Sequence, residues 1–183
     1  MITSLHTLPS PPATAVLPKR IAFSERRVRR RDPAVNVMTD FTRETPVTVS
    51  EEQQIGATLS DMIRFGVRAM LVVRGAQVIG FITSYDIEGE KPMQYLQNST
   101  YTRHHEILVG DIMTPLSDVV ALNWRNVENA SVEEVLDVFH HISAMHILVL
   151  EPAQPVVHVR GLFSRTQIER LIMPEPALHQ RAG

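Results

Sequence analysis

The sequence predicts a mixed α/β (α+β) fold in which one structural unit is used twice. A Gly, two apolar residues, a hydroxyl residue, two spacers and a polar residue occur at 80–86 and again at 161–167. Each copy closes a run of residues with high strand propensity, and each unit begins with a Met-Thr pair, at 38–39 and at 113–114. Duplicated motifs in the same order indicate one architectural unit repeated along the chain.

The first unit is predicted to contain a strand, a helix, two strands and a helix. After a strand at 47–49, Ser50–Gln53 matches a capping box, which is a typical helix start. Gly66 is a typical helix end. Strands at 69–73 and 77–82 follow around a tight turn, and a further helix starts near Ser84. The apolar face of the first helix is expected to comprise four residues: Ile55, Leu59, Met62 and Ile63.

The second unit repeats this order with a longer connection. Ser131–Glu134 is its capping box. Five extra residues fall at 151–155, where a longer loop costs little, and a helix at 165–172 closes the unit. The apolar face of its first helix is expected to comprise Val132, Val135, Leu136 and Phe139.

Composition excludes several classes of protein. The chain has 183 residues, 44% of them hydrophobic, as in ordinary globular proteins. It has no cysteine, so disulfides, thiolate metal sites and cysteine nucleophiles are excluded. No apolar run of about 18 residues spans a membrane, and the N-terminus lacks the pattern of a secretory signal. We therefore expect a cytoplasmic protein that does not contact a membrane.

The net charge of −2 hides a basic arm. Without this arm the body of the chain is acidic, so nucleic acid is expected to bind only through the arm, if at all. The arm is interpreted as a solvated segment, or as one that contacts a nucleotide phosphate or an acidic partner. Seven of the 18 basic residues lie within thirteen positions: Lys19, Arg20, Arg26, Arg27, Arg29, Arg30 and Arg31.

No pattern indicates a metal site or catalysis. The eight histidines include two adjacent pairs, whose members point in different directions in a helix or strand, and none shows metal-ligand spacing. The acidic residues Asp86, Glu88 and Glu90 fit a solvated turn better than a Mg²⁺ site. No nucleophile elbow, P-loop or dinucleotide fingerprint occurs. We therefore expect no metal, no catalytic residue and no enzymatic activity.

The duplicated hydroxyl motif has two interpretations. Thr83 would end a strand and begin a helix, and Asp86 follows three residues later. Free N–H groups at such a start bind phosphate, and a carboxylate accepts hydrogen bonds from both hydroxyls of a ribose. The motif therefore fits a nucleoside phosphate site. The same spacing is also that of a capping box, which only closes the helix start.

Taken together, these motifs resemble those of a tandem CBS-domain protein, that is, a cystathionine β-synthase domain pair or Bateman module. The resemblance covers about residues 34–173 and leaves no separate catalytic region, as in a stand-alone sensor. It implies two βαββα repeats packed around a pseudo-twofold axis, with two clefts between them. In many members these clefts bind AMP, ADP, ATP, S-adenosylmethionine or other adenosine ligands, such as NAD.

The resemblance also assigns site residues. In the first cleft Thr83 and Asp86 would hold phosphate and ribose, and the backbone at Val47 and at Ala69–Met70 would meet the adenine, with Thr39 and Ser84 nearby. The second cleft would use Ser164, His146 and Arg165, but its carboxylate position is Gln167. An amide cannot hold a ribose diol as a carboxylate does, so this cleft is expected to be weaker or empty.

We expect a regulatory module that binds an adenosine nucleotide, AMP or ATP, and acts on an unidentified protein target, as a homodimer. The alternative is an interaction protein whose arginine-rich arm binds nucleic acid or an acidic partner. The expected boundaries are a flexible tail with the arm at 1–33, the first repeat at 34–98, a linker with the second repeat at 99–173, and a C-terminal tail at 174–183.

Overall fold

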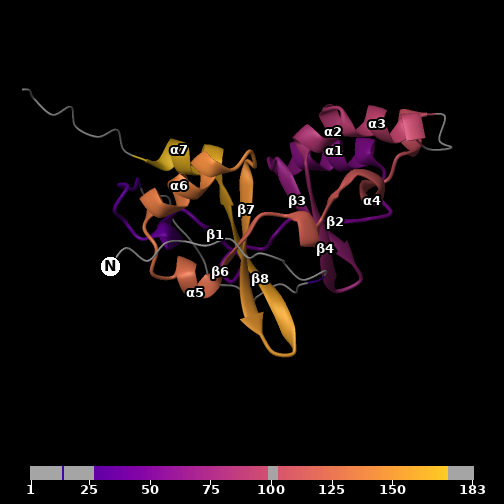
Figure 1. Cartoon of the computed structure of the whole chain (residues 1–183). Coiled ribbons are helices and arrows are strands. Elements are labelled where there is room, and N and C mark those ends of the chain that lie inside the picture. Colours follow the sequence, from indigo (N-terminus) through magenta and orange to yellow (C-terminus); the bar gives the residue numbers. More distant parts are fainter. Residues whose placement is uncertain (1–13, 15–26, 99–102, 173–183) are drawn as a thin grey trace, which may run out of the picture.

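The structure is a computed structural model that describes residues 14, 27–98 and 103–172. Its strands form two four-stranded sheets, with the strand orders β2-β3-β4-β5 and β1-β8-β7-β6. Each sheet and its helices make one lobe, and the two lobes lie side by side (Figure 1). This architecture confirms the predicted mixed α/β class and the repeated unit.

The first sheet is built mainly from the first repeat. Its strands are β2 (Thr48–Ser50), β3 (Ala69–Arg74), β4 (Gln77–Thr83) and β5 (Thr114–Pro115). Strand β3 is parallel to β2 and antiparallel to β4, and β5 pairs antiparallel with the other edge of β4. The predicted hairpin at 69–82 is confirmed.

The second sheet repeats this arrangement. Its strands are β1 (Thr39–Asp40), β6 (Ala121–Asn123), β7 (His146–Ala153) and β8 (Val156–Ser164). Strand β7 is parallel to β6 and antiparallel to β8. The five extra residues do not form the expected longer loop. They lengthen β7 and β8, because the register continues to Ala153 opposite Val156.

Each sheet takes its last strand from the other repeat. Strand β1 lies at the start of the first repeat but pairs with β8 of the second, and β5 lies near the start of the second repeat but pairs with β4 of the first. A Cβ atom on Gly161 would lie 2.5 Å from the Thr39 carbonyl oxygen, and one on Gly80 would lie 2.7 Å from Met113 Sδ. Glycine at these two positions therefore permits the close approach of the exchanged strands.

The helices of the first repeat are α1 (Ile55–Phe65), α2 (Ser84–Glu88), α3 (Lys91–Asn98) and α4 (Val109–Ile112). Helix α1 ends at Gly66, as predicted, with φ of 67°. The predicted start was wrong: no side chain caps α1, which begins at Ile55. The physical reason is tertiary, because the backbone before α1 bonds to the segment at 107–110 instead.

The prediction that Ile63 belongs to the buried apolar face of α1 was also wrong. Ile63 is 76% exposed, whereas Ile55 and Met62 are buried and Leu59 is partly buried. Thr58 is buried in its place, with its hydroxyl bonded to the Gln54 carbonyl oxygen one turn earlier. The buried face of α1 therefore includes fewer large apolar residues than the hydrophobic pattern predicts.

The helices of the second repeat are α5 (Trp124–Val127), α6 (Val132–His141) and α7 (Arg165–Leu171). The predicted capping box is confirmed at Ser131 and Glu134. All four predicted core residues of α6 are buried. Three short 3₁₀ helices complete the described part: η1 (Ala34–Asn36), η2 (His104–Glu106) and η3 (Leu116–Asp118).

Three apolar clusters hold the described residues together. One packs the helices of the first repeat on their sheet, and a second does the same in the second repeat. The third lies between the sheets and contains Leu71 and Phe81 of the first sheet with Leu148 and Val159 of the second. The repeats therefore pack sheet to sheet.

The segment at 27–36 is docked on the second repeat. Residues 27–33 of the expected N-terminal tail are therefore packed on the fold. Val28 is 1% exposed, and its N–H donates to the Leu171 carbonyl oxygen at 3.0 Å. The Arg30 carbonyl oxygen accepts from the N–H of Glu133 at 2.8 Å. Backbone bonds and one apolar side chain dock this part of the arm. The rest of the arm lies outside the described residues.

We predict that Gly161→Ala lowers the free energy of unfolding by about 1–3 kcal/mol, because the added methyl would meet backbone. Gly80→Ala should also be destabilising, because its Cβ would lie 2.8 Å from the Thr114 carbonyl oxygen as well as 2.7 Å from Met113 Sδ. Gly56→Ala is the control, because nothing lies within 4 Å and Ala favours α1. Urea denaturation that finds Gly161→Ala as stable as the parent would contradict the close approach.

Candidate functional site

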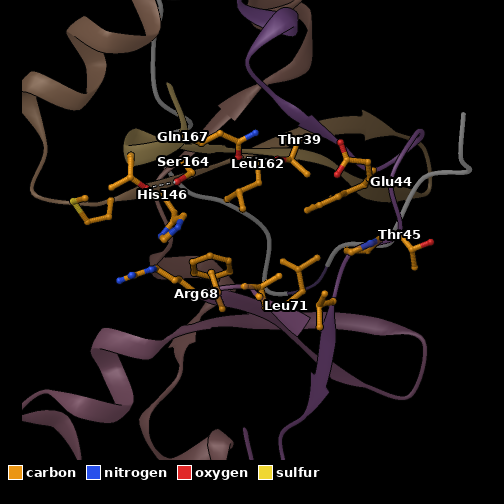
Figure 2. Close-up of a pocket in the computed structure, with 18 of the residues that line it drawn as sticks. Thr39, Glu44, Thr45, Arg68, Leu71, His146, Leu162, Ser164 and Gln167 are labelled. Carbon is orange, nitrogen blue, oxygen red and sulfur yellow. Dashed lines mark hydrogen bonds between the residues drawn. The ribbon is translucent and has the colours of Figure 1, made fainter. Parts of the chain in front are cut away.

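A cavity of about 660 Å³ opens where the two repeats meet. Figure 2 shows its lining, with residues of both repeats around one hollow. Its floor is apolar and includes Val47, Leu71 and Phe81 from the first repeat and Leu162 from the second. A cavity of this size that combines apolar surface with polar side chains fits a small-molecule site.

Three polar side chains line one wall of the cavity. Thr39 lies on the exchanged strand β1, Ser164 ends β8 and Gln167 lies on α7. Thr39 Oγ1 donates to Gln167 Oε1 at 3.4 Å, which leaves the Gln167 amide nitrogen without a partner among the described residues. Ser164 does not cap α7, and its hydroxyl lies 3.1 Å from Thr166 Oγ1. This wall can both donate and accept hydrogen bonds.

The cavity is charged at its rim. Arg68 and Arg170 line it, and neither forms an ion pair with another described residue. Glu44 is the one carboxylate of the lining. Arg68 and Glu44 lie at opposite ends of the hollow in Figure 2. Two guanidinium groups against one carboxylate give this part of the molecule a net positive charge.

His146 lies at the start of β7 and lines the cavity at the Arg68 end (Figure 2). Its ring meets Phe81 edge-on, with 5.4 Å between the centroids. Burial lowers the pKa of the His146 imidazole below its ordinary value, and the nearby negative charge of Asp86 offsets only part of this effect. The imidazole is therefore neutral at pH 7, and it can donate one hydrogen bond and accept another.

The expected first cleft is divided in the structure. Thr39, Val47 and Ala69 line the cavity, but Thr83, Ser84, Asp86 and Met70 do not. Met70 and Ser84 are buried. Among the residues expected in the second cleft, Ser164, His146 and Gln167 line this same cavity, whereas Arg165 instead pairs with Glu169. The cavity is thus lined both by residues from the start of the first repeat and by the closing motif of the second repeat.

Asp86 is fully engaged within the protein. Its Oδ2 accepts from the N–H of Thr83 at 2.8 Å and from Thr83 Oγ1 at 2.7 Å, which is a capping box at the start of α2. Its Oδ1 lies 2.7 Å from Lys91 Nζ. The two closing motifs therefore differ: one is a closed cap, and the other faces a cavity.

Sequence reasoning missed six polar or charged residues of the lining: Glu44, Thr45, Arg68, Tyr85, Thr166 and Arg170. Tyr85 and Thr166 are spacers of the duplicated motif, and the others belong to no motif and come from different loops and helices. Arg68 carries only a general signal, since it lies in the short loop between α1 and β3, and binding residues are often found on loops.

The described residues contain neither a metal-binding group nor a membrane-spanning helix. Within 14, 27–98 and 103–172, no three or more acidic, histidine or cysteine residues come together as a metal site. The helices in these ranges are too short or too polar to cross a membrane.

Residues 37–89 match the family model of the CBS domain. None of the curated proteins matches the sequence. A conserved protein from Pyrococcus horikoshii has a similar structure, with a TM-score of 0.55 and 20% identity over 78% of this chain and 93% of its own.

Two ligand-bound structures are also similar. The CBS domain pair of MJ0100, in complex with 5′-methylthioadenosine and S-adenosyl-L-methionine, has a TM-score of 0.53 and 18% identity over 76% of this chain and 94% of its own. CBSX2 in complex with AMP has a TM-score of 0.50 and 19% identity over 75% and 93%. Residues 37–89 are thus similar to a CBS domain, and the fold of the chain is that of a CBS-domain pair.

We predict a stability loss on mild acidification that depends on His146. The unfolded chain binds a proton near pH 6.5, but the folded state resists that proton because the pKa of His146 is lowered. The free energy of unfolding therefore falls as the pH drops from 6.5 toward the folded pKa. His146→Gln should remove this part of the pH dependence, and His105→Gln, at an exposed site, should keep it. Equal pH profiles for parent and His146→Gln would refute it.

Proposed function

We propose that the chain is a regulatory CBS-pair module, without catalytic activity, that binds an adenosine-containing ligand in the cavity between its repeats. The observation that carries this proposal is the cavity of about 660 Å³, with its apolar floor, hydrogen-bonding wall and arginines. The ligands named for two structures of the same fold, AMP in one and two adenosine derivatives in the other, support the ligand class.

The lining suggests how such a ligand is held. The base is proposed to rest on the apolar floor at Val47 and Leu71. The ribose hydroxyls face Thr39 and Gln167, since these side chains donate and accept hydrogen bonds. A phosphate lies toward Arg68, because a guanidinium binds phosphate through two parallel hydrogen bonds.

The charge of the lining favours an anionic ligand over a cationic one. Arg68 and Arg170 outweigh Glu44, and His146 adds no charge at pH 7. A nucleotide such as AMP or ATP is therefore preferred to S-adenosylmethionine, whose sulfonium group is positive. Since the described residues offer no metal cluster at the cavity, the nucleotide is proposed to bind without a resident metal.

Such a ligand contacts both repeats at once. Arg68 and Val47 belong to the first repeat, and Ser164 and Gln167 to the second. Ligand binding therefore stabilises one relative arrangement of the two repeats, which is how a small molecule shifts a protein between states. We propose that this shift is read by a protein target in the cytoplasm, and that the exposed arginines at 27, 29 and 31 are available to an acidic partner.

We also propose that the chain forms a homodimer through the helices of the first repeat. Three large apolar side chains on helices of the first repeat are exposed outside the cavity: Ile63 at 76%, Phe65 at 52% and Met93 at 58%. Among the described residues of the second repeat, Val156 in the β7–β8 hairpin is the only exposed large apolar residue. Exposed apolar groups gathered on neighbouring helices are typical of protein interfaces.

We predict that Arg68→Ala and Gln167→Ala weaken AMP binding, whereas Asp86→Ala leaves it within about twofold. Loss of a hydrogen bond to a charged group costs about 1.5–3 kcal/mol, or roughly ten- to a hundredfold for Arg68→Ala. The neutral contact at Gln167 should cost about 1 kcal/mol. Arg125→Ala is the charge-matched control, since Arg125 is exposed and outside the lining.

Isothermal titration calorimetry with AMP, ADP, ATP, S-adenosylmethionine and NAD would measure these affinities. If the parent binds none of them, the proposed function fails. If Asp86→Ala loses affinity and Gln167→Ala does not, the ligand occupies the other cleft.

We predict that Ile63→Glu converts the dimer to a monomer, because a carboxylate in an apolar interface loses its hydration without a partner. Val156→Glu, an equally charged change in the other lobe, should leave the dimer intact. Multi-angle light scattering at tens of micromolar protein measures both. A monomeric parent would contradict the proposed dimer.

A further inference from the structure

The two repeats place corresponding residues at two equivalent positions, which we call the two clefts: one is the cavity, and the other is centred on Asp86. The strand registers identify the corresponding pairs. Thr83 is opposite Ala69 in the first sheet, as Ser164 is opposite His146 in the second. Thr114 is opposite Phe81, as Thr39 is opposite Leu162. Asp86 and Gln167 follow three residues after Thr83 and Ser164, so they also correspond.

These corresponding residues are connected differently in the two clefts. In the cleft with the cavity, Thr39 bonds directly to Gln167 at 3.4 Å, and both side chains line the cavity. In the other cleft, a lysine stands between the equivalent pair. Lys91 Nζ lies 2.7 Å from Asp86 Oδ1 and donates to Thr114 Oγ1 at 3.1 Å.

Lys91 is held on three sides. Besides Asp86 and Thr114, its ammonium group donates to the carbonyl oxygen of Ile112 at 3.2 Å, so all three of its N–H groups have acceptors. The residue at the same spacing in the second repeat is Ile172, which cannot form such bonds. The lysine is therefore a feature of one cleft only, and it is not a consequence of the repeated architecture.

We propose that the ammonium group of Lys91 takes the place of a ligand's hydroxyl groups beside Asp86, so that this second cleft is closed and the chain binds one ligand. The class of ligand rests on the proposed function. The interaction itself rests on the bonds of Lys91, which leave no free oxygen on Asp86: Oδ2 is bonded to Thr83 and Oδ1 faces the ammonium group.

Removal of the charge should therefore expose a carboxylate that can accept hydrogen bonds from a ribose. Side-chain exposure is 15% for Asp86 and 40% for Lys91, so the lysine lies on the solvent side of the carboxylate. Lys91→Met keeps most of the side-chain length but removes the donors. Lys91→Arg keeps the charge and is the matched control. Lys91→Gln is a second neutral variant, to be used if Lys91→Met does not fold.

The experiment is calorimetric titration of the full chain with AMP and, separately, with adenosine, which carries no charge to be repelled by Asp86. We expect one equivalent bound by the parent and by Lys91→Arg, and two by Lys91→Met for at least one of the two ligands. The double variant Lys91→Met/Asp86→Asn should return to one equivalent, because the amide lacks the second acceptor. Circular dichroism confirms that each variant is folded.

The outcomes separate this inference from the proposed function. Two equivalents bound by the parent, or no gain in the folded neutral variants with either ligand, would overturn the role of Lys91 and leave the cavity's ligand intact. A third outcome is that the parent binds neither compound, Lys91→Met binds one equivalent, and the double variant Lys91→Met/Asp86→Asn binds none. In that case the proposed function fails and the role of Lys91 stands. A gain that survives Asp86→Asn would also overturn the inference, because the ligand would then bind elsewhere.

Discussion

The close approach of two strands to two glycines is the constraint on which the rest of the structure depends. At Gly80 and at Gly161 the partner strand comes from the other repeat and lies so near that a methyl group has no room. Because these strands are exchanged, neither repeat completes its own sheet. Residues 37–89, which match the CBS domain, contain three strands of the first sheet and give β1 to the second. Each repeat therefore depends on the other for a complete sheet.

The same exchange builds the candidate site. Strand β1 carries Thr39 across to the second repeat, where it meets Gln167, while the chain that follows returns to the first repeat and lines the cavity from Glu44 to Val47. The cavity is consequently bounded by loops and strand ends of both lobes, and its shape depends on their relative position. A molecule held there acts on the joint between the repeats rather than on either of them alone.

Sequence reasoning predicted the order of the elements well, because the hydrophobic period, the glycine at 66 and the box at Ser131 are local signals. It did not predict the strand exchange, since periodicity identifies a strand and not its partner. Val47 and Ala69 were therefore grouped with Asp86, although they line the same cavity as Gln167 and Asp86 does not line it. The sequence also did not predict that the closing motif at 80–86 forms a closed helix cap while the motif at 161–167, with the same spacing, lines the cavity. This difference depends on Lys91 and on Thr114, which lies 23 residues further along the chain.

The docked segment at 27–36 has a mechanical consequence. Val28 pairs in parallel with Ile172, so the chain enters and leaves the described fold at one corner of the second repeat, next to α7 and far from the helices of the first repeat in Figure 1. A force applied between residues 27 and 172 would be borne first by this pairing and by the contacts of Val28, while the central sheets carried no load. Whatever is fused at either end of this fold would therefore pull on the same corner, and the cavity would be shielded from that tension until the corner had opened.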